Sequence, residues 1–350
     1  MTDTTFAIAG RAIGPEHPPY IVAELSGNHF GSKAHMLRLL EAASRTGADA
    51  VKLQTYTPDT ITLDHDGPEF RLTDGPWAGR TLYDLYTEAH TPWDWHADLF
   101  SRGRELGITV FSSPFDETAI ALLESLGAPA YKIASFECID LPLIAAAAAT
   151  GKPLIISTGM ADDGEIAEAV AAARAAHATG VALLHCVSAY PARAEDYHLR
   201  SIPALARSHG VVAGLSDHTL GTTVAVAAVS LGACIVEKHM TMARADGGPD
   251  ASFSLEPDEF ATLVRTCREA WAALGSGAPA VVPEEERNAR LRRSLYAVAD
   301  IPGGAPLTRD NVRSIRPGNG LAPKHLPSVL GRRARTAIAR GTPLAWTLID

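Results

Sequence analysis

Short runs of apolar, mostly β-branched residues recur along the chain, separated by segments whose apolar residues follow helical spacing. Eight such runs occur, at residues 20–26, 49–55, 108–114, 130–136, 153–159, 181–187, 211–217 and 234–240. Short continuous runs of this kind are typical of parallel strands that are buried on both faces. Several of the intervening segments end on glycine, which is common just after the last residue of a helix.

Eight strand–helix units in succession predict an α/β protein with a (β/α)8 TIM barrel, a fold of about 250 residues. The alternative is a doubly wound open sheet, but no Gly-x-Gly-x-x-Gly motif follows the first run. We therefore expect the barrel.

The segment between the second and third runs is longer than one helix requires. Residues 56–90 predict an inserted loop with a small hairpin, and long loops at this position of a barrel are usually functional. The following segment predicts the helix itself, with Thr91 as its N-cap and Pro92 at its first position.

The C-terminal part of the chain differs from the rest in its composition and in the pattern of its apolar residues. Residues 278–290 are rich in Gly, Pro and charge, which is typical of a linker. Short apolar runs then alternate with Gly/Pro turns, which predicts a small, mostly β domain at 291–350 that has few residues for a core of its own. We expect the barrel to occupy residues 1–277.

Polar and charged residues follow the apolar runs, where a barrel has its active site. The strongest examples are "SDHT" at 216–219 and "EKHM" at 237–240. In chain order the predicted strand ends carry Glu24, Lys52, Gln54, Ser112, Ser113, Lys132, Ser135, Ser157, Thr158, His185, Ser188, Ser216, Asp217, His218, Glu237, Lys238 and His239.

Two of these residues, His218 and His239, end neighbouring strands of the predicted barrel. Imidazoles on adjacent strands can share one divalent metal ion, whereas either histidine alone would more often be a core residue bonded to a carbonyl. Together, beside Asp217 and Glu237, they favour a metal site. With only two histidine ligands, water and substrate oxygens would complete the coordination shell, as Lewis-acid catalysis requires.

The chain has few lysines, and Lys52, Lys132 and Lys238 lie inside apolar runs. Each therefore needs an anionic partner or ligand, because a lone buried ammonium is costly. The lysines and strand-end serines together suggest a phosphate site. Two other interpretations of Lys132 stay open: a structural ion pair with Glu137, and a Schiff-base nucleophile as in barrel aldolases. Each serine alone could equally be a turn former.

Composition narrows the class of protein. The formal net charge of −9 argues against a nucleic-acid binder. The four cysteines form no Cys-x-x-Cys pair, so we expect buried thiols in a reducing compartment. No basic, apolar leader or run of roughly 20 apolar residues is present, so we expect a cytoplasmic protein without membrane partners.

The chain resembles the sialic-acid-synthase family, the phosphoenolpyruvate-condensing synthases of nine-carbon sugar acids, over essentially its whole length. The motifs that carry this resemblance are "IVAELSGNHFG", "GADAVKLQTYTPDT", "FSSPFD", "YKIASFECIDLPLI", "IISTGMA", "LLHCVSAYP", "GLSDHTLG", "VEKHMTMAR" and "SIRPGNGLAP". Within the family, "LQTYTPDT", "FSSPFD" and "YKIASFE" look most like pseudaminic acid synthases. The C-terminal segment looks like the antifreeze-like (SAF) domain of these enzymes.

The resemblance implies a role for each matching residue. His218 and His239 would bind Mn²⁺ or Mg²⁺ and act in catalysis, together with Glu24 and Glu137. Phosphoenolpyruvate would be held by Lys52, Ser113, Lys132, Ser135, Ser157, Ser188 and Ser216. Some relatives carry Thr at the position of Ser113 and Asn at that of Ser188.

The sugar would be contacted by Gln54, Tyr190 and Asp250, and by Arg316 from the partner subunit of a domain-swapped homodimer. The implied reaction joins phosphoenolpyruvate to the open-chain aldehyde of an amino hexose, and phosphate leaves by C–O cleavage. The alternatives are an N-acetylneuraminate or legionaminate synthase of the same family, a Schiff-base aldolase, and a sugar-binding protein without catalysis.

Overall fold

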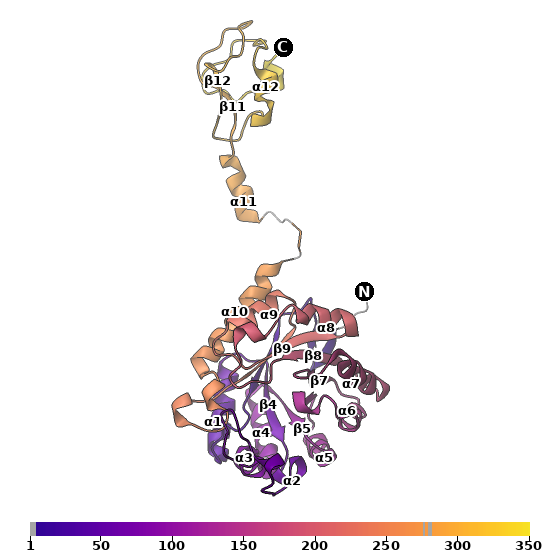
Figure 1. Ribbon diagram of the computed structural model, residues 1–350. Helices are drawn as coiled ribbons and strands as arrows, with labels where there is room; N and C mark the ends of the chain where they lie inside the picture. The colour runs from indigo at the N-terminus through magenta and orange to yellow at the C-terminus, as the bar shows by residue number, and fades with distance from the viewer. Residues whose placement is uncertain (1–4, 276, 279–281) are drawn as a thin grey trace. The chain divides into compact units, whose positions relative to one another are not determined.

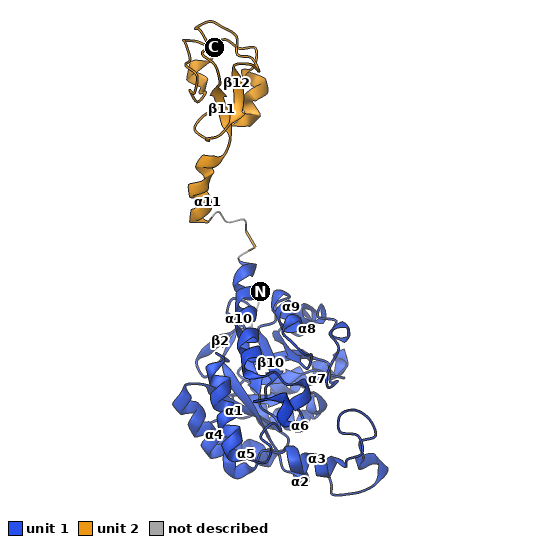
Figure 2. Ribbon diagram, turned by 90° about the vertical axis from the view of Figure 1, so that its left-hand side faces the viewer, with its two compact units in different colours: residues 1–275 blue, residues 276–350 orange. Residues whose placement is uncertain are grey.

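The computed structural model describes residues 5–275, 277–278 and 282–350. The chain divides into two compact units, Met1–Gly275 and Ser276–Asp350 (Figure 2). Within the described residues, no helix has the length and apolar character needed to cross a bilayer.

Unit 1 is a closed barrel of eight parallel strands in the order β10-β3-β4-β5-β6-β7-β8-β9 (Figure 1). The predicted TIM barrel is confirmed, and every apolar run identified in the sequence contains one of its strands. These are β3 (Tyr20–Glu24), β4 (Ala50–Thr55), β5 (Thr109–Pro114), β6 (Tyr131–Ile133), β7 (Leu154–Ser157), β8 (Val181–Cys186), β9 (Val212–Asp217) and β10 (Ile235–His239).

Helices surround the strands (Figure 1). They are α1 (Lys33–Arg45), α4 (Trp93–Leu106), α5 (Glu117–Ser125), α6 (Leu141–Ala148), α7 (Asp163–Ala175), α8 (Ser201–His209), α9 (Thr223–Ser230) and α10 (Pro257–Leu274). Several begin at capping side chains, such as Asp116 before α5 and Asp162 before α7. The prediction for α4 was one residue early: Pro92 is its N-cap, and Thr91 lies outside the helix.

Side chains along each strand alternate between two cores. Residues such as Ile21, Val51 and Val236 face the helices. Tyr20, Val22, Ala50, Phe111, Ile155, Leu184 and Ile235 face the barrel interior. By the same period of two, side chains at the carboxyl ends of the strands point either into the barrel mouth or outward beneath the helices.

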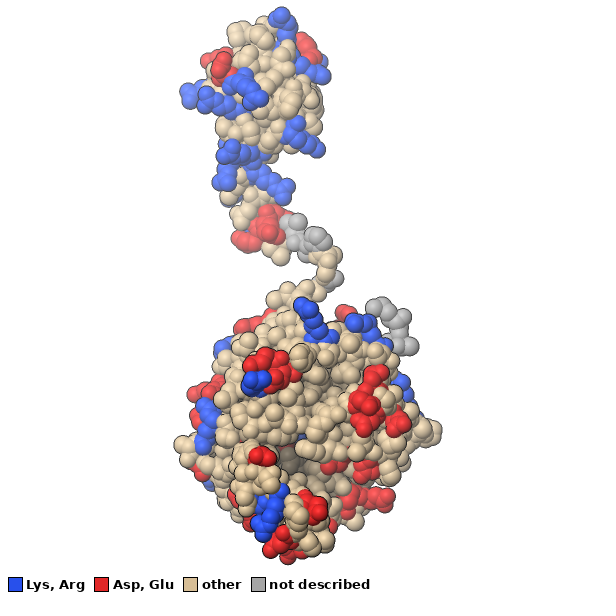
Figure 3. All heavy atoms as spheres, in the orientation of Figure 1, with Lys and Arg blue, Asp and Glu red and all other residues tan. Residues whose placement is uncertain are grey.

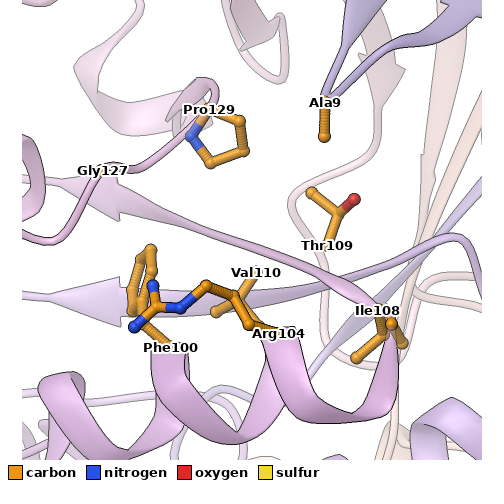
Figure 4. A pocket seen from close by; sticks show the side chains of 9 residues that line it. Ala9, Phe100, Arg104, Ile108, Thr109, Val110, Gly127 and Pro129 are labelled. Atoms are coloured by element: carbon orange, nitrogen blue, oxygen red, sulfur yellow. The ribbon is translucent and has the colours of Figure 1, made fainter.

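The amino end of the barrel is closed by a hairpin, β1 (Phe6–Ile8) and β2 (Arg11–Ile13). Ile8 and Ile13 are almost fully buried and belong to the interior core. A cavity of about 330 Å³ is lined by the hairpin residue Ala9 and by residues around the α4–β5 and α5–β6 connections (Figure 4).

The insertion after β4 contains α2 (Pro58–Ile61) and α3 (Leu82–Ala89). The predicted hairpin between them is small. Arg71 and Thr81 form an isolated antiparallel β-bridge, and Gly79 N donates to Leu72 O at 2.8 Å. Trp77, at the tip, donates from Nε1 to Pro249 O at 2.9 Å. The insertion therefore reaches the loop that follows β10.

Unit 2 has its own small core, which includes Leu295, Ile301, Val312 and Leu344. It contains the antiparallel strands β11 (Ser294–Ala297) and β12 (Val312–Ile315), isolated bridges, and α12 (Leu326–Val329). Of the predicted linker 278–290, residues 279–281 lie outside the described residues, and part of the remainder forms helix α11 (Pro283–Asn288).

Candidate active site

Four buried charges meet inside the mouth of the barrel. Lys52 Nζ on β4 lies 2.8 Å from Glu24 Oε2 on β3 and 3.3 Å from Glu237 Oε1 on β10. Lys132 Nζ on β6 lies 3.8 Å from the same Glu237 oxygen and donates to Ile133 O at 3.1 Å. Gln54 Nε2 donates to Glu24 Oε1 at 2.9 Å. The expected anionic partners of Lys52 and Lys132 are therefore present.

Burial and neighbouring charge set the ionisation of this cluster. Burial raises the pKa of Glu24, and the repulsion from Glu237 adds to it against the attraction of Lys52. For Glu237, the attraction of Lys132 and Lys52 outweighs burial and lowers the pKa. Burial lowers the pKa of Lys132, despite Glu237 nearby. An anionic ligand placed beside Lys132 would favour its charged form.

Hydroxyl groups surround the two lysines. Ser113 Oγ accepts from Lys52 Nζ at 3.3 Å. The Ser157 and Ser216 hydroxyls lie 2.9 Å apart across β7 and β9, and Ser216 Oγ lies 3.5 Å from Glu237 Oε1. Cations and hydroxyl donors on one inner face form a suitable site for a phosphate group.

Ser135 and Ser188 meet beside Gly159, in the loop after β7. Gly159 N donates to Ser135 Oγ at 3.2 Å. A Cβ at this glycine would lie 2.3 Å from Ser188 Oγ and 2.8 Å from Ser135 Oγ. Any larger residue would occupy the space between the two hydroxyls, so the glycine keeps this part of the candidate anion site open.

The two candidate metal ligands come together at the same mouth. The imidazoles of His218 and His239 have centroids 5.4 Å apart. His218 Nδ1 bonds Val187 O at 2.9 Å, and His239 Nδ1 lies 3.2 Å from Ser26 Oγ. His239 therefore keeps Nε2 for a metal. At His218 the Cys186 side chain is a further hydrogen-bond partner, and against the effect of burial it raises the pKa of that ring. Burial and the proximity of His218 lower the pKa of His239, which keeps that ring neutral, as a ligand must be.

The two histidines have no third ligand of the common types beside them in the described parts of the chain. Among the described residues, no group of three His, Cys, Asp or Glu side chains is placed to hold a metal ion. Asp217 is next to His218 in the sequence, but its side chain points to the outer face of the strand and pairs with Lys238 at 2.7 Å. Two imidazoles at one mouth fit a metal that also binds water and substrate oxygens.

A cavity of about 400 Å³ adjoins His239 and opens toward the insertion. Its polar lining includes Gln54, Glu137, Tyr190 and Asp250, and much of the remainder is apolar: Ile61, Leu72, Trp77, Leu82, Leu85, Phe115 and Phe136. The Tyr190 ring lies 4.5 Å from that of His218 and 5.4 Å from that of Trp77, measured between centroids. The insertion thus forms one wall of the cavity.

Glu137 faces this cavity from the loop after β6. Burial raises the pKa of its carboxyl to about 7, and its Oε2 has no hydrogen-bond partner among the described residues. The ion pair between Glu137 and Lys132, one of the interpretations that the sequence left open, is absent within 4.0 Å in the described structure, where Lys132 pairs with Glu237 instead. Glu137 is left as a carboxyl group that can exchange a proton near neutral pH.

Three other strand-end residues face outward and serve the scaffold. Ser112 Oγ lies 2.6 Å from Thr55 Oγ1, which also bonds His96. His185 bonds the carbonyl of Tyr197. Thr158 Oγ1 donates to Leu184 O at 3.2 Å.

Arg316 lies in unit 2, directly after β12, and is exposed. Within the described part of unit 2 it forms no ion pair with Asp310, a nearby acidic residue of the same unit. Lys and Arg side chains are prominent on the surface of this unit (Figure 3), and its acidic residues after α11 are Asp300, Asp310 and Asp350. The role of Arg316 toward the sugar stays a prediction.

Sequence reasoning did not assign three contributors to the site: Ser26, Gly159 and Trp77. Glu237 was noted at a strand end but given no role in binding. The spacing of Glu237 and His239 was a usable signal, because residues two apart on a strand share a face. Nothing in the sequence showed that Trp77 or Ser26 would approach this mouth, since both contacts join distant loops.

Comparisons with known proteins cover both units. A model of the NeuB family matches residues 39–279, and a model of the SAF domain matches residues 292–350. The chain is 42% identical to pseudaminic acid synthase from Helicobacter pylori over 94% of this chain and 97% of that protein. It is 35% identical to N,N'-diacetyllegionaminic acid synthase from Legionella pneumophila, over 95% and 94% of the two chains.

Among solved structures, the N-acetylneuraminic acid (sialic acid) synthetase of Leptospira borgpetersenii, in complex with citrate, is similar to this chain with a TM-score of 0.73. The two are 30% identical, and the match covers 81% of this chain and 94% of the other.

Proposed function

The chain belongs to the NeuB family, and we propose that it acts as a pseudaminic acid synthase. It condenses phosphoenolpyruvate with the open-chain aldehyde of 2,4-diacetamido-2,4,6-trideoxy-L-altrose, giving pseudaminic acid and phosphate. The observation that carries this proposal is the convergence of two lysines, a set of hydroxyls and two histidines on one inner face of the barrel. The named relatives support the choice of product class.

Phosphoenolpyruvate binds deepest in the mouth in this proposal. Lys52 and Lys132 supply the positive charge, and the hydroxyls donate to phosphate and carboxylate oxygens. The residues in contact are Lys52, Ser113, Lys132, Ser135, Ser157, Ser188 and Ser216. Space for the anion at Ser135 and Ser188 follows from the missing side chain at Gly159.

His218 and His239 would hold the divalent metal, Mn²⁺ or Mg²⁺, through their Nε2 atoms. When bound there, the metal would supply Lewis-acid polarisation of the sugar aldehyde. The protein's own part is to orient both rings, through Val187 O and Ser26 Oγ, and to keep His239 neutral through burial.

The bond changes are those of an aldol-like condensation. C3 of phosphoenolpyruvate attacks the aldehyde carbon, and C2 becomes electron-poor. Water adds at C2, and the C–O bond to phosphate then breaks. Glu137, with its pKa raised to about 7, donates a proton to the former aldehyde oxygen, and the buried carboxyl group of Glu24 receives the proton of the water.

The sugar occupies the cavity beside His239, where Gln54, Tyr190 and Asp250 are the polar contacts. The wall built by Ile61, Leu72 and Leu82 has no hydrogen-bonding side chain. A sugar with a methyl group at C6 therefore suits it better than one with a 6-hydroxyl, because a hydroxyl buried without a partner costs about 1–3 kcal/mol.

Phosphate release with a panel of amino sugars tests this proposal. We expect turnover with the 2,4-diacetamido trideoxy sugar and little with N-acetylmannosamine. A preference for N-acetylmannosamine, or for the legionaminate precursor, would assign the chain to one of those activities instead. No phosphate release with any sugar, at any Mn²⁺ concentration, would favour a sugar-binding protein.

The Schiff-base alternative has a separate test. Borohydride added with both substrates reduces an imine and adds the mass of the substrate to the protein. We expect no added mass at Lys132, because the proposed reaction has no covalent lysine intermediate. A labelled Lys132 would contradict the proposal.

We further propose a domain-swapped homodimer in the cytoplasm, in which each unit 2 supplies Arg316 to the site of the partner subunit. Four buried, unpaired cysteines agree with a reducing compartment. In a complementation test, Arg316→Ala and His239→Ala chains are each weakly active or inactive alone. After subunit exchange, one site in each mixed dimer has both groups, and we expect partial recovery of activity. No recovery, with exchange confirmed by mass, would exclude action across the dimer.

A further inference from the structure

A second buried ion pair lies on the outer face of the strands that carry the histidines. Lys238 Nζ on β10 lies 2.7 Å from Asp217 Oδ2 on β9, and both side chains are 0% exposed. The two residues are direct register partners in the sheet. Outside the sheet, Cys267 and Glu259 of α10 are titratable groups whose charges act on Lys238.

The ion pair is part of a network that also holds Thr219. Lys238 Nζ donates to Thr219 O at 2.6 Å. Asp217 Oδ1 accepts from Thr219 N at 2.9 Å and from Thr219 Oγ1 at 2.8 Å. Thr219, which follows His218, is therefore bonded to β10 through its carbonyl, and to Asp217 at the end of β9 through its amide and its hydroxyl.

Each histidine is a direct chain neighbour of this network. His218 lies between Asp217 and Thr219, and His239 follows Lys238. Because successive side chains on a strand point to opposite faces, the network lies behind the sheet while both imidazoles face the barrel mouth. The backbone at His218 is also bound on its own account, since His218 N donates to Tyr197 Oη at 2.7 Å.

We propose that Lys238 and Asp217 are positioning residues, which set the separation and direction of His218 and His239 and thereby the affinity of the site for a divalent metal. This inference rests on the proposed metal site and adds two residues that touch neither metal nor substrate. The bond from Lys238 to the Thr219 carbonyl is the decisive contact, because it joins the turn after β9 to β10.

Stability alone is a weak reason for such a pair. Replacing a buried ion pair by apolar side chains of similar volume is often neutral or stabilising, whereas removal of one partner leaves a costly unpaired charge. Apolar residues could fill the space between sheet and α10, but they could not bind the polar groups of Thr219. The positional role accounts for charged residues beneath α10, whose buried side chains are Phe260, Leu263, Val264 and Cys267.

The test measures Mn²⁺ binding directly, by calorimetry or electron paramagnetic resonance, together with the melting temperature. Wild type is compared with Lys238→Met and with the double variant Lys238→Met/Asp217→Asn. We expect Lys238→Met to raise the Kd for Mn²⁺ by roughly 10- to 100-fold, as loss of a group that orients metal ligands commonly does. Binding of phosphoenolpyruvate without metal should change by less than about threefold.

The double variant distinguishes an effect on the position of the metal ligands from an effect on the stability of the protein. It leaves no unpaired carboxylate, and the amide introduced by Asp217→Asn keeps an oxygen for Thr219 N, so its melting temperature should recover toward that of wild type. Its Kd for Mn²⁺ should stay raised, because the bond to Thr219 O is still missing. The double variant also decides the question if Lys238→Met does not fold.

Leu263→Ala in α10 is the matched control, because it removes packing from the same layer and leaves the network intact. It should lower the melting temperature and leave the Kd for Mn²⁺ within about twofold of wild type. A wild-type Kd in either Lys238 variant, or a Kd raised equally by Leu263→Ala, would overturn the positioning role. Absence of Mn²⁺ binding in wild type would overturn the proposed metal site itself, and this inference with it.

Discussion

The two ends of the barrel are built from the same eight strands, yet their inner faces differ completely. At the amino end, Ile8 and Ile13 of the hairpin pack on Tyr20, Phe111 and other apolar residues of the interior core. At the carboxyl end, the same interior holds Lys52, Lys132, Glu24 and Glu237, all buried.

The change takes place within two residues of a strand, about 6.6 Å along its axis. On β3 the inward residues run from Tyr20 and Val22 to Glu24, and on β10 from Ile235 to Glu237 and His239. Hydrophobic burial at one end stabilises the barrel, and this allows unfavourable burial of charge at the other. The comparison predicts that substitutions at the two ends change different measured quantities.

Loss of either histidine at the carboxyl end should have the largest effect on kcat/KM. His218→Ala and His239→Ala should each lower kcat/KM by about a thousandfold or more, equivalent to about 4 kcal/mol of transition-state stabilisation. The double variant should be no worse than either alone, because both serve one ion. A chelator should reproduce the loss.

His209→Ala on α8, remote from the mouth, is the control and should retain wild-type activity. Full activity of wild type in metal-free buffer would contradict the assignment of both histidines.

Substitution of Glu137 should have the next largest effect on kcat/KM. Its protonated form is the proton donor and its pKa is raised to about 7, so kcat/KM should fall as pH rises above 7. Glu137→Gln should lower kcat/KM by about a hundredfold at pH 7 and should abolish this alkaline limb. The measurement is a full pH profile of both proteins.

Glu168→Gln, at an exposed position of α7, should leave the profile unchanged. Persistence of the limb in Glu137→Gln would assign the titration to another group.

Substitutions at the amino end should lower stability alone. They should have the smallest effect on catalysis. Ile8→Ala removes buried methyl groups from the interior core and should cost about 2–5 kcal/mol. For a unit of this size, the melting temperature should fall by about 5–15 °C. At 25 °C, kcat/KM of the folded protein should stay within about twofold.

Arg104→Ala, in the cavity at this end, should change neither quantity (Figure 4). A large loss of kcat/KM in Ile8→Ala while the protein stays folded would show that the two ends are coupled.

Much of the barrel could be predicted because its strands are strongly apolar on both faces, and a run such as "VALLHCV" is too apolar for a surface loop and too short for a typical helix. The hairpin β1–β2 was missed, since its three-residue strands are too short to produce a periodic signal. Thr91 has the chemistry of an N-cap, but the helix begins after Pro92. At the start of this helix, tertiary packing outweighed the local capping preference of Thr91.

The residues of the candidate site likewise divide into those that the sequence could predict and those that it could not. Residue types at strand ends identified Lys52, His218 and His239, because the carboxyl ends of barrel strands meet at one face. The partner of Lys132 could not be predicted, since Glu137 is near in sequence whereas Glu237 is brought near by closure of the barrel.

The sequence by itself determined the fold class, the order of the strand–helix units and the end of the barrel where the candidate site lies. Hydrophobic periodicity and residue type are local properties, and they are sufficient for these conclusions. Only the tertiary structure decided which neighbours of each strand end face the mouth and which face the helices. It separated Lys52 and Glu237 from Lys238 and Asp217, because the direction of each side chain follows from register and twist once eight strands close on one another.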